Sequence, residues 1–326
     1  MKAFTYKSVT SEEQAVKALG ANAVPLAGGT SLLNLMKERV LEPEVVVNLK
    51  DIKGLAQVEA IADGLRIGAN ATLAALLENK AVRSSYPVLA QALETVGTPQ
   101  IRNMATLGGN LCARTPCWYY MHESFPCAKA GRGNTCPAKE GENEFNAIFA
   151  TDGPCVSVHA SSAAPALVAL GAKVRIVGAS GAREIDIEKF FTLPKDNVQK
   201  ENVLAANEIV THITLPKPAP KSATYVVLQK GSHDWPVCQA SVVLDLAGDT
   251  AKSSRICLGA VAPIPWRAAA AEAALAGQKV SEATASKAAE AALTGAAPLA
   301  QNGYKKQSLK AAVKRAILVA ATGKWR

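Results

Sequence analysis

Five of the seven cysteines lie within one 44-residue stretch, and this cluster is the feature of the sequence that most clearly suggests chemistry. They are Cys112, Cys117, Cys127, Cys136 and Cys155, with nine, eight and eighteen residues between the last four. Four thiolates from one loop can hold a [4Fe-4S] cluster or a zinc ion. Zinc ribbons generally use close cysteine pairs, which are absent here, and an odd cysteine would be left over from disulfides. The residues alone leave open a cluster, zinc, and disulfides or free thiols.

Two glycine pairs stand in similar local sequences, Leu-Ala-Gly-Gly-Thr-Ser-Leu at 26–32 and Thr-Leu-Gly-Gly-Asn-Leu at 106–111. Each predicts a tight turn after an apolar stretch. Glycine accepts positive φ and allows a ligand to approach the backbone N–H groups closely. Two such turns could hold a diphosphate from two sides through nests of N–H donors, and the alternative is two ordinary turns. The spacings of the Rossmann and P-loop motifs are absent.

Other reactive side chains form no recognisable catalytic set. The four histidines, His122, His159, His212 and His233, show neither metal-ligand nor catalytic spacing, and no Gly-x-Ser-x-Gly motif occurs. Cys238 and Cys257 each lie inside an apolar, strand-like segment, which is typical of buried cysteine. We therefore expect no catalytic residue for substrate chemistry on this chain.

Short strands and helices alternate through the first part of the chain and must position these residues. The patterns predict helices at 11–19 (capped by Ser11), 31–39, 72–77, 86–96 and 163–170, and strands at 24–27, 44–49 and 65–67. Between 111 and 155 the sequence is rich in Gly, Pro, Cys and charged residues and predicts no regular helix or strand. A Pro- and Lys-rich connector at 216–221 indicates a domain boundary. Strands at 225–229, 239–246 and 254–261 then precede Ala-rich helices at 267–275, 280–293 and 309–321, which predicts a compact α+β domain.

Composition narrows the class of protein. The 326 residues are 49% hydrophobic, enough for real cores, and no apolar run reaches the length of a membrane span. The net charge is +9, but the basic residues are scattered and aromatic residues are only 5%, which argues against nucleic-acid binding. The start, MKAFTYKSV, lacks an apolar signal core, so we expect no export signal of its own. The compartment stays open, because a partner could carry the chain into the periplasm.

Six segments match one family in the same order along nearly the whole chain. They are LAGGTSLLNLMK (26–37), IGANATL (67–73), GTPQIRNMATLGGNL (97–111), VHASSAAPALVALGAKV (158–174), NEIVTHITLP (207–216) and LGAVAPIPWR (258–267). The chain resembles the FAD-binding medium subunit of the xanthine dehydrogenase and carbon monoxide dehydrogenase family. The resemblance implies an α+β protein with a two-part FAD-binding domain of the vanillyl-alcohol-oxidase (PCMH) type at 1–216, divided into about 1–57 and 58–216. A smaller α+β domain of the CO dehydrogenase flavoprotein type would follow at 221–326.

The resemblance also implies which residues contact FAD. The first glycine turn would place Ala27, Gly28, Gly29, Thr30 and Ser31 on the diphosphate, and the flanking Leu26 and Leu32 would also belong to the cofactor site. The second would approach it with Thr106, Gly109 and Asn110, and Val96 and Gly97 would lie along the dinucleotide. Ser161 and Ser162 match a Ser-Asp pair, so Ser162 departs from the family pattern. Val210 would pack on the isoalloxazine, and Lys230 would place a cation near the polar edge of the flavin, unless it is a surface lysine at a strand end.

The cysteine-rich insert, about 112–155, resembles that of two branches of the family. One is the FAD subunit of 4-hydroxybenzoyl-CoA reductase. The closer one is that of bacterial periplasmic aldehyde oxidoreductase, where GENEFNAIF (141–149) also has a counterpart. Both carry an additional [4Fe-4S] cluster. The resemblance implies Cys117, Cys127, Cys136 and Cys155 as its ligands, and leaves Cys112 over as part of the second glycine turn.

The implied function is electron transfer within a heterotrimeric molybdenum hydroxylase. A large subunit with a molybdenum cofactor would oxidise aldehydes, including aromatic ones, to carboxylic acids. A small subunit with [2Fe-2S] clusters would pass the electrons to FAD on this chain and on to an external acceptor. The alternatives are a subunit of a 4-hydroxybenzoyl-CoA reductase-like or xanthine dehydrogenase-like enzyme, a stand-alone flavoprotein with a zinc-stabilised loop, and a scaffold that has lost FAD.

Overall fold

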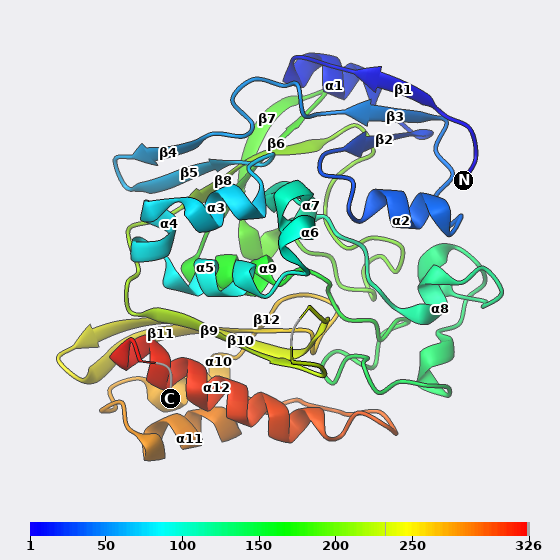
Figure 1. Cartoon of the computed structure of the whole chain (residues 1–326). Helices are drawn as coiled ribbons and strands as arrows, with labels where there is room; N and C mark the ends of the chain where they lie inside the picture. Colours follow the sequence, from blue (N-terminus) through cyan, green and yellow to red (C-terminus); the bar gives the residue numbers. More distant parts are fainter. Residues whose placement is uncertain (232, 325–326) are drawn as a thin grey trace.

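The computed structural model describes residues 1–231 and 233–324, which form three β-sheets (Figure 1). The N-terminal sheet is parallel, in the order β1-β3-β2, with β1 at Thr5–Ser8, β3 at Val45–Asn48 and β2 at Ala23–Leu26. Its central strand is rich in valine, and Val46 and Val47 are buried. Helix α1 (Glu12–Ala18) begins as predicted, because the Ser11 hydroxyl accepts a hydrogen bond from the Gln14 N–H at 3.2 Å.

A second sheet of five antiparallel strands lies beside the first. Its order is β4-β5-β8-β6-β7, and the strands span Val58–Ile61, Gly64–Gly68, Ile209–Leu215, Lys173–Gly178 and Gly181–Asp186. Short helices cover one face of this sheet: α3 (Leu73–Glu78), α4 (Lys80–Ser85), α5 (Pro87–Glu94), α6 (Pro99–Met104) and α7 (Leu107–Leu111). The two sheets and these helices surround the glycine-rich segments.

Helix α9 (Ala163–Leu170) is apolar all round, and all eight of its residues are buried. It lies beside α5, between the five-stranded sheet and a third sheet below (Figure 1). A helix without a polar face is stable only when protein encloses it on every side, which fits this central position.

The third sheet belongs to the C-terminal part of the chain. It is antiparallel in the order β12-β11-β10-β9, with strands at Trp266–Arg267, Thr250–Gly259, Pro236–Ala247 and Ser222–Leu228. Helices α10 (Ala269–Leu275), α11 (Glu282–Ala291) and α12 (Lys305–Thr322) cover the face turned away from α9 (Figure 1). The predicted order of strands followed by Ala-rich helices is confirmed.

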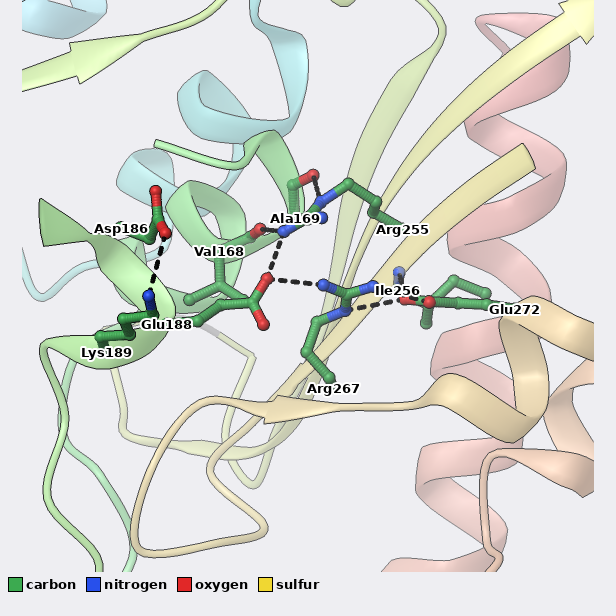
Figure 2. Close-up of polar contacts among 9 residues, drawn as sticks. All are labelled: Val168, Ala169, Asp186, Glu188, Lys189, Arg255, Ile256, Arg267 and Glu272. Carbon is green, nitrogen blue, oxygen red and sulfur yellow. Dashed lines mark hydrogen bonds and ion pairs between the residues drawn. The ribbon is translucent and has the colours of Figure 1, made fainter. Parts of the chain in front are cut away.

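An ion-pair cluster joins the C-terminal sheet to the rest of the protein (Figure 2). Glu188, in the 3-10 helix η3 (Ile187–Lys189), accepts hydrogen bonds from Arg255 of β11 and Arg267 of β12. Arg267 also pairs with Glu272 of α10 at 2.7 Å. These side chains are partly exposed, so each pair adds little stability on its own, and the cluster chiefly fixes orientation.

The insert is irregular apart from α8 (Trp118–Met121), η1 (Ala128–Ala130) and η2 (Pro137–Lys139), and it projects at one side of the molecule (Figure 1). The Arg132 guanidinium organises its outer part by donating to the carbonyls of Tyr119, Tyr120, His122 and Phe125 at 2.9–3.2 Å. A single side chain thereby satisfies carbonyls that no regular element would pair.

The second half of the insert, residues 143–149, packs into the C-terminal unit. Phe149 stacks on Trp266, with ring centroids 5.3 Å apart, and Ile148 shares the same core. The buried Lys305 ammonium donates to the carbonyls of Phe145, Asn146 and Ala260 at 2.8–3.0 Å. The insert is therefore anchored by residues far away in the sequence. Among the residues that the structure describes, no helix is long and apolar enough to cross a membrane.

Candidate functional site

A cavity of about 660 Å³ lies where the N-terminal sheet, α6, α7 and the start of α9 meet. This is within the range of roughly 300–1,000 Å³ that is usual for ligand pockets. Thirteen residues predicted from the sequence line it: Ala27, Gly28, Gly29, Thr30, Ser31, Leu32, Val96, Gly97, Thr106, Gly109, Asn110, Ser162 and Val210. Leu26, Ser161 and Lys230 are not among its lining residues. The fold thus brings together segments that are up to about 180 residues apart in sequence.

The first glycine turn offers a row of free hydrogen-bond donors to this cavity. Gly29 has φ +75°, and the backbone N–H groups of residues 28–32 donate to no acceptor among the described residues. Backbone donors in a folded protein nearly always find a partner, so five consecutive free ones indicate a ligand or water. Gly28 lies directly against the backbone of α6: a Cβ at this position would be 1.9 Å from the Met104 oxygen.

The second glycine pair is not the turn that the sequence predicted. Gly108 and Gly109 lie inside the short helix α7, which Thr106 caps by accepting from the Gly109 N–H at 3.2 Å. The Leu107 and Gly108 N–H groups donate to the carbonyls of Ala71 and Ala69. Because the Leu107, Gly108 and Gly109 N–H groups are engaged within the protein, the second segment is a helix start and not a second nest like the first.

Asn110 links α7 to the start of α9. Its Oδ1 accepts from the Ser161 hydroxyl at 2.6 Å and from the Ala163 N–H at 3.4 Å. These two bonds fix the orientation of the amide, with Oδ1 toward α9. The Nδ2 group of Asn110, which lines the cavity, has no partner among the described residues. Ser161 is buried beneath the wall, whereas Ser162 lies on it.

The Val96–Gly97 loop is held by Arg102 of α6. One guanidinium nitrogen, Nη1, donates to the carbonyls of Glu94, Val96 and Gly97 at 3.2, 3.1 and 3.0 Å. Gly97 has φ +49°, a conformation that favours glycine. The sequence did not single out Arg102, since nothing local shows that its guanidinium turns back onto the preceding loop.

The loop before β10 supplies a wall that the sequence did not predict. His233, Asp234, Trp235 and Pro236 line the cavity, and His233 Nδ1 lies 3.2 Å from the Gly97 oxygen. His233 also has a positive φ of 58°, which is uncommon outside glycine. The predicted Lys230 is instead exposed, with its N–H on the Asp234 carboxylate at 3.3 Å.

The four cysteines expected as metal ligands gather within the insert. Cys136 donates its S–H toward Cys155, and this hydrogen bond lowers the pKa of Cys155 and raises that of Cys136. Burial raises the pKa of Cys117, with smaller effects from Cys155 and Cys127. All seven cysteines are free thiols. Within the described ranges, no group of three or more His, Cys, Asp or Glu side chains has the geometry of a finished metal site.

Cys112 stands apart from those four. It follows α7 and lines the cavity together with Ala113, Arg114, Thr115, Pro116 and Met121. Burial raises its pKa to about 12, and the nearby Glu201 charge adds to this effect. A thiol with such a pKa stays protonated and unreactive at neutral pH.

A buried charge cluster connects the cavity wall to the insert. Glu201 is 6% exposed and forms two ion pairs. Its Oε2 lies 2.6 Å from Arg114 Nε, and its Oε1 lies 3.0 Å from Lys129 Nζ. Lys129 is itself only 4% exposed and lies two residues after Cys127. The carboxylate therefore connects the cavity-lining Arg114, which is partly exposed, to the cysteine loop through a second ion pair with Lys129 that is shielded from water.

Comparison with known proteins identifies the family. Residues 2–218 match the family described as FAD binding domain in molybdopterin dehydrogenase, and residues 223–320 match the CO dehydrogenase flavoprotein C-terminal domain. The chain is 36% identical to the aldehyde oxidoreductase FAD-binding subunit PaoB of Escherichia coli over 84% of this chain and 86% of that protein. It is 26% identical to the glyceraldehyde dehydrogenase medium chain of Sulfolobus acidocaldarius, covering 86% of this chain and 83% of the relative.

Solved structures agree with the sequence matches. Quinoline 2-oxidoreductase from Pseudomonas putida aligns with a TM-score of 0.79 and 25% identity over 99% of both chains. Carbon monoxide dehydrogenase from Hydrogenophaga pseudoflava aligns with a TM-score of 0.77 and 27% identity over 98% of this chain and 97% of the other. The expected α+β fold, a FAD-binding domain followed by a C-terminal domain, is confirmed. The chain belongs to the family of FAD-binding medium subunits of molybdopterin-dependent dehydrogenases, of the carbon monoxide and xanthine dehydrogenase type.

Proposed function

We propose that this chain binds FAD in the 660 Å³ cavity and serves as the electron-transfer subunit of a heterotrimeric molybdenum hydroxylase. Its partners would be a large subunit with the molybdenum cofactor and a small subunit with [2Fe-2S] clusters. The observation that carries the proposal is the row of five free N–H groups at residues 28–32, because a diphosphate is the part of FAD that needs such donors. When bound, FAD supplies the conversion between one-electron and two-electron transfer.

The cavity residues divide the work of holding FAD. The first glycine turn would receive the diphosphate, and the Asn110 amide would donate to it from the opposite wall. The Val96–Gly97 loop and Ser162 would lie along the rest of the dinucleotide. Val210, 7% exposed, would offer an apolar surface to the isoalloxazine ring and exclude water from it. Lys230 would take part only if its exposed side chain turned toward the cavity.

We also propose that Cys117, Cys127, Cys136 and Cys155 hold a [4Fe-4S] cluster. Support comes from the donor set, which is four thiols in one loop. Cys136 is hydrogen-bonded to Cys155, and the charges of Cys155 and Cys127 both raise the pKa of Cys117. Thiolates are the usual ligands of such clusters, whose chemistry is one-electron transfer. The insert also forms part of the cavity wall through Thr115 and Met121, which would place such a cluster close to the flavin.

The proposed substrate of the complex is an aldehyde, oxidised on the partner subunit to a carboxylic acid. The proposal rests on the similarity to the aldehyde oxidoreductase subunit of Escherichia coli, which extends over most of both chains. The glyceraldehyde dehydrogenase medium chain points to the same class of substrate. The residues of this chain would affect that reaction only by accepting electrons from it.

The test is an elemental and flavin assay of the full chain purified with its natural partners under anaerobic conditions. One FAD per chain, with about four iron and four sulfide beyond those of the partner, would support both parts of the proposal. Zinc in place of the extra iron would overturn the cluster and leave the flavin. Absence of flavin would overturn the function itself and favour a scaffold.

Matched cysteine variants make the cluster assay specific. Cys127→Ser should remove the extra iron and leave the flavin content unchanged. Cys257→Ser is the control, because Cys257 is a fully buried thiol of β11 in the core around α9 and is not one of the four proposed ligands. Equal iron in the two variants would exclude Cys127 as a ligand.

A further inference from the structure

Helix α9 is held at both ends by the C-terminal sheet. At its start, Gln239 of β10 donates through Nε2 to the Ser162 oxygen at 2.8 Å. At its end, Arg255 of β11 donates to the oxygens of Val168 and Ala169 at 2.8 and 3.0 Å (Figure 2). The Ser162 and Ala169 oxygens have no other partner among the described residues, whereas the Val168 oxygen also accepts from the Gly171 N–H at 3.0 Å. The sheet thus fixes both the position and the axial rotation of α9.

The bond at the start of α9 belongs to a buried polar chain. Gln239 is 1% exposed, and its second Nε2 hydrogen reaches the Ser241 hydroxyl at 3.1 Å. Ser241 in turn lies 2.8 Å from the Thr224 hydroxyl, which donates to the Val88 oxygen of α5 at 2.7 Å. The two bonds of Nε2, to Ser162 and to Ser241, orient the buried Gln239 amide so that it faces α9.

The position of α9 sets the orientation of two cavity residues. Ser162, whose carbonyl is bound by Gln239, lines the cavity directly. The Ser161 hydroxyl and the Ala163 N–H hold the Asn110 oxygen, so that its amide nitrogen is left for the cavity. A shift or rotation of α9 would therefore move Ser162 and release Asn110 together.

We propose that Gln239 and Arg255 are positioning residues for the flavin, acting through α9 without touching the cavity. This inference rests on the proposed FAD site and adds a role for the C-terminal domain: it fixes the wall that meets the cofactor. Side chains that orient contact groups commonly change affinity when removed, even though they make no contact themselves.

The experiment compares two variants with two matched controls in the full chain. Gln239→Met and Arg255→Met each remove an anchor of α9. The first control, Thr224→Val, removes the hydrogen bond to α5 at the far end of the polar network that includes Gln239. The second control, Arg267→Met, removes the other arginine that binds Glu188, and Arg267 forms no hydrogen bond with α9 in the described part of the chain. The readouts are the FAD dissociation constant, the visible circular dichroism of bound flavin, and the melting temperature.

We expect the two anchor variants to bind FAD about fivefold more weakly or worse, the effect of about one hydrogen bond, with an altered flavin dichroism. The two controls should stay within about twofold of wild type in affinity, even where they lower the melting temperature. The inference is overturned if affinity follows melting temperature across all four variants, or if no variant changes it. Wild-type protein that binds no FAD would instead refute the proposed function.

Discussion

Gly28→Ala offers a sharp test of the glycine turn. The added Cβ would be 1.9 Å from the Met104 oxygen and 2.7 Å from its carbonyl carbon, whereas real Cβ atoms essentially never approach within 3.0 Å. The turn or α6 must therefore move by about 1 Å, and neither obstacle is a flexible side chain. Overpacking of this kind costs about 1–3 kcal/mol, and a backbone obstacle places it near the upper value.

That strain has two separate consequences. About 3 kcal/mol lowers the melting temperature by roughly 4–5 °C in a chain of 326 residues, since the entropy of unfolding is about 2.1 cal/mol/K per residue. The displacement also moves the free N–H groups of 28–32 away from their ligand. Hydrogen bonds to charged groups contribute about 1.5–3 kcal/mol each, so losing two of them weakens FAD binding by about 100-fold or more.

The assay is flavin titration by fluorescence, with differential scanning fluorimetry on the same samples. Gly20→Ala is the matched control, because a Cβ there meets nothing within 4 Å and its φ is not positive. A Gly28→Ala protein that melts and binds FAD like this control would refute the packing of the turn on α6. Weaker folding with unchanged FAD affinity would refute the assignment of the diphosphate to this turn.

Three further predictions concern the surroundings of the cavity. Glu201→Gln leaves the buried Lys129 and the partly buried Arg114 without their carboxylate and should cost about 3–5 kcal/mol in urea unfolding. Glu59→Gln, in an exposed pair with Arg66, should cost less than about 1 kcal/mol, and equal losses would contradict the role of burial. Burial lowers the pKa of His159 from 6.5 to about 3, so between these pH values the unfolded chain binds a proton that the folded chain does not, and the free energy of unfolding falls as the pH falls. Urea unfolding at pH 7 and at pH 4.5 should show a smaller loss of stability on acidification in His159→Asn than in wild type. An equal loss in the two proteins would disprove this role. Arg102→Lys should weaken FAD binding several-fold in the flavin fluorescence titration, because one flexible ammonium does not reproduce a guanidinium that binds three carbonyls. An affinity equal to wild type would show that the Val96–Gly97 loop keeps its conformation without Arg102.

Local sequence signals predicted the elements whose causes are local. The Ser11 cap, the valine strand at 45–48 and the apolar helix at 163–170 were all visible, because capping and hydrophobic periodicity act over a few residues. Family resemblance then added what spacing alone left open: which segments gather around one cavity.

The errors and omissions arise from contacts that are distant in sequence. Whether the second glycine pair forms a turn or a helix depends on the carbonyls of Ala69 and Ala71, which take the N–H groups that would otherwise face a ligand. His233 and Trp235 line the cavity from the loop between β9 and β10, far along the chain from the glycine segments. No local pattern near His233 predicts its hydrogen bond with the Gly97 oxygen, because Gly97 lies 136 residues earlier in the chain.

The anchoring of the insert by Lys305 has a consequence for the order of events during synthesis. Phe145, whose carbonyl this lysine binds, leaves the ribosome 160 residues before Lys305 does. At about 5–20 residues per second, the cysteine loop waits roughly 8–32 s for the helix that fixes its second half. During that interval the segment around Phe145 lacks the hydrogen bonds that Lys305 donates to Phe145 and Asn146 in the finished fold. Any metal that enters the insert before residue 305 has been made therefore enters a loop whose second half is not yet fixed.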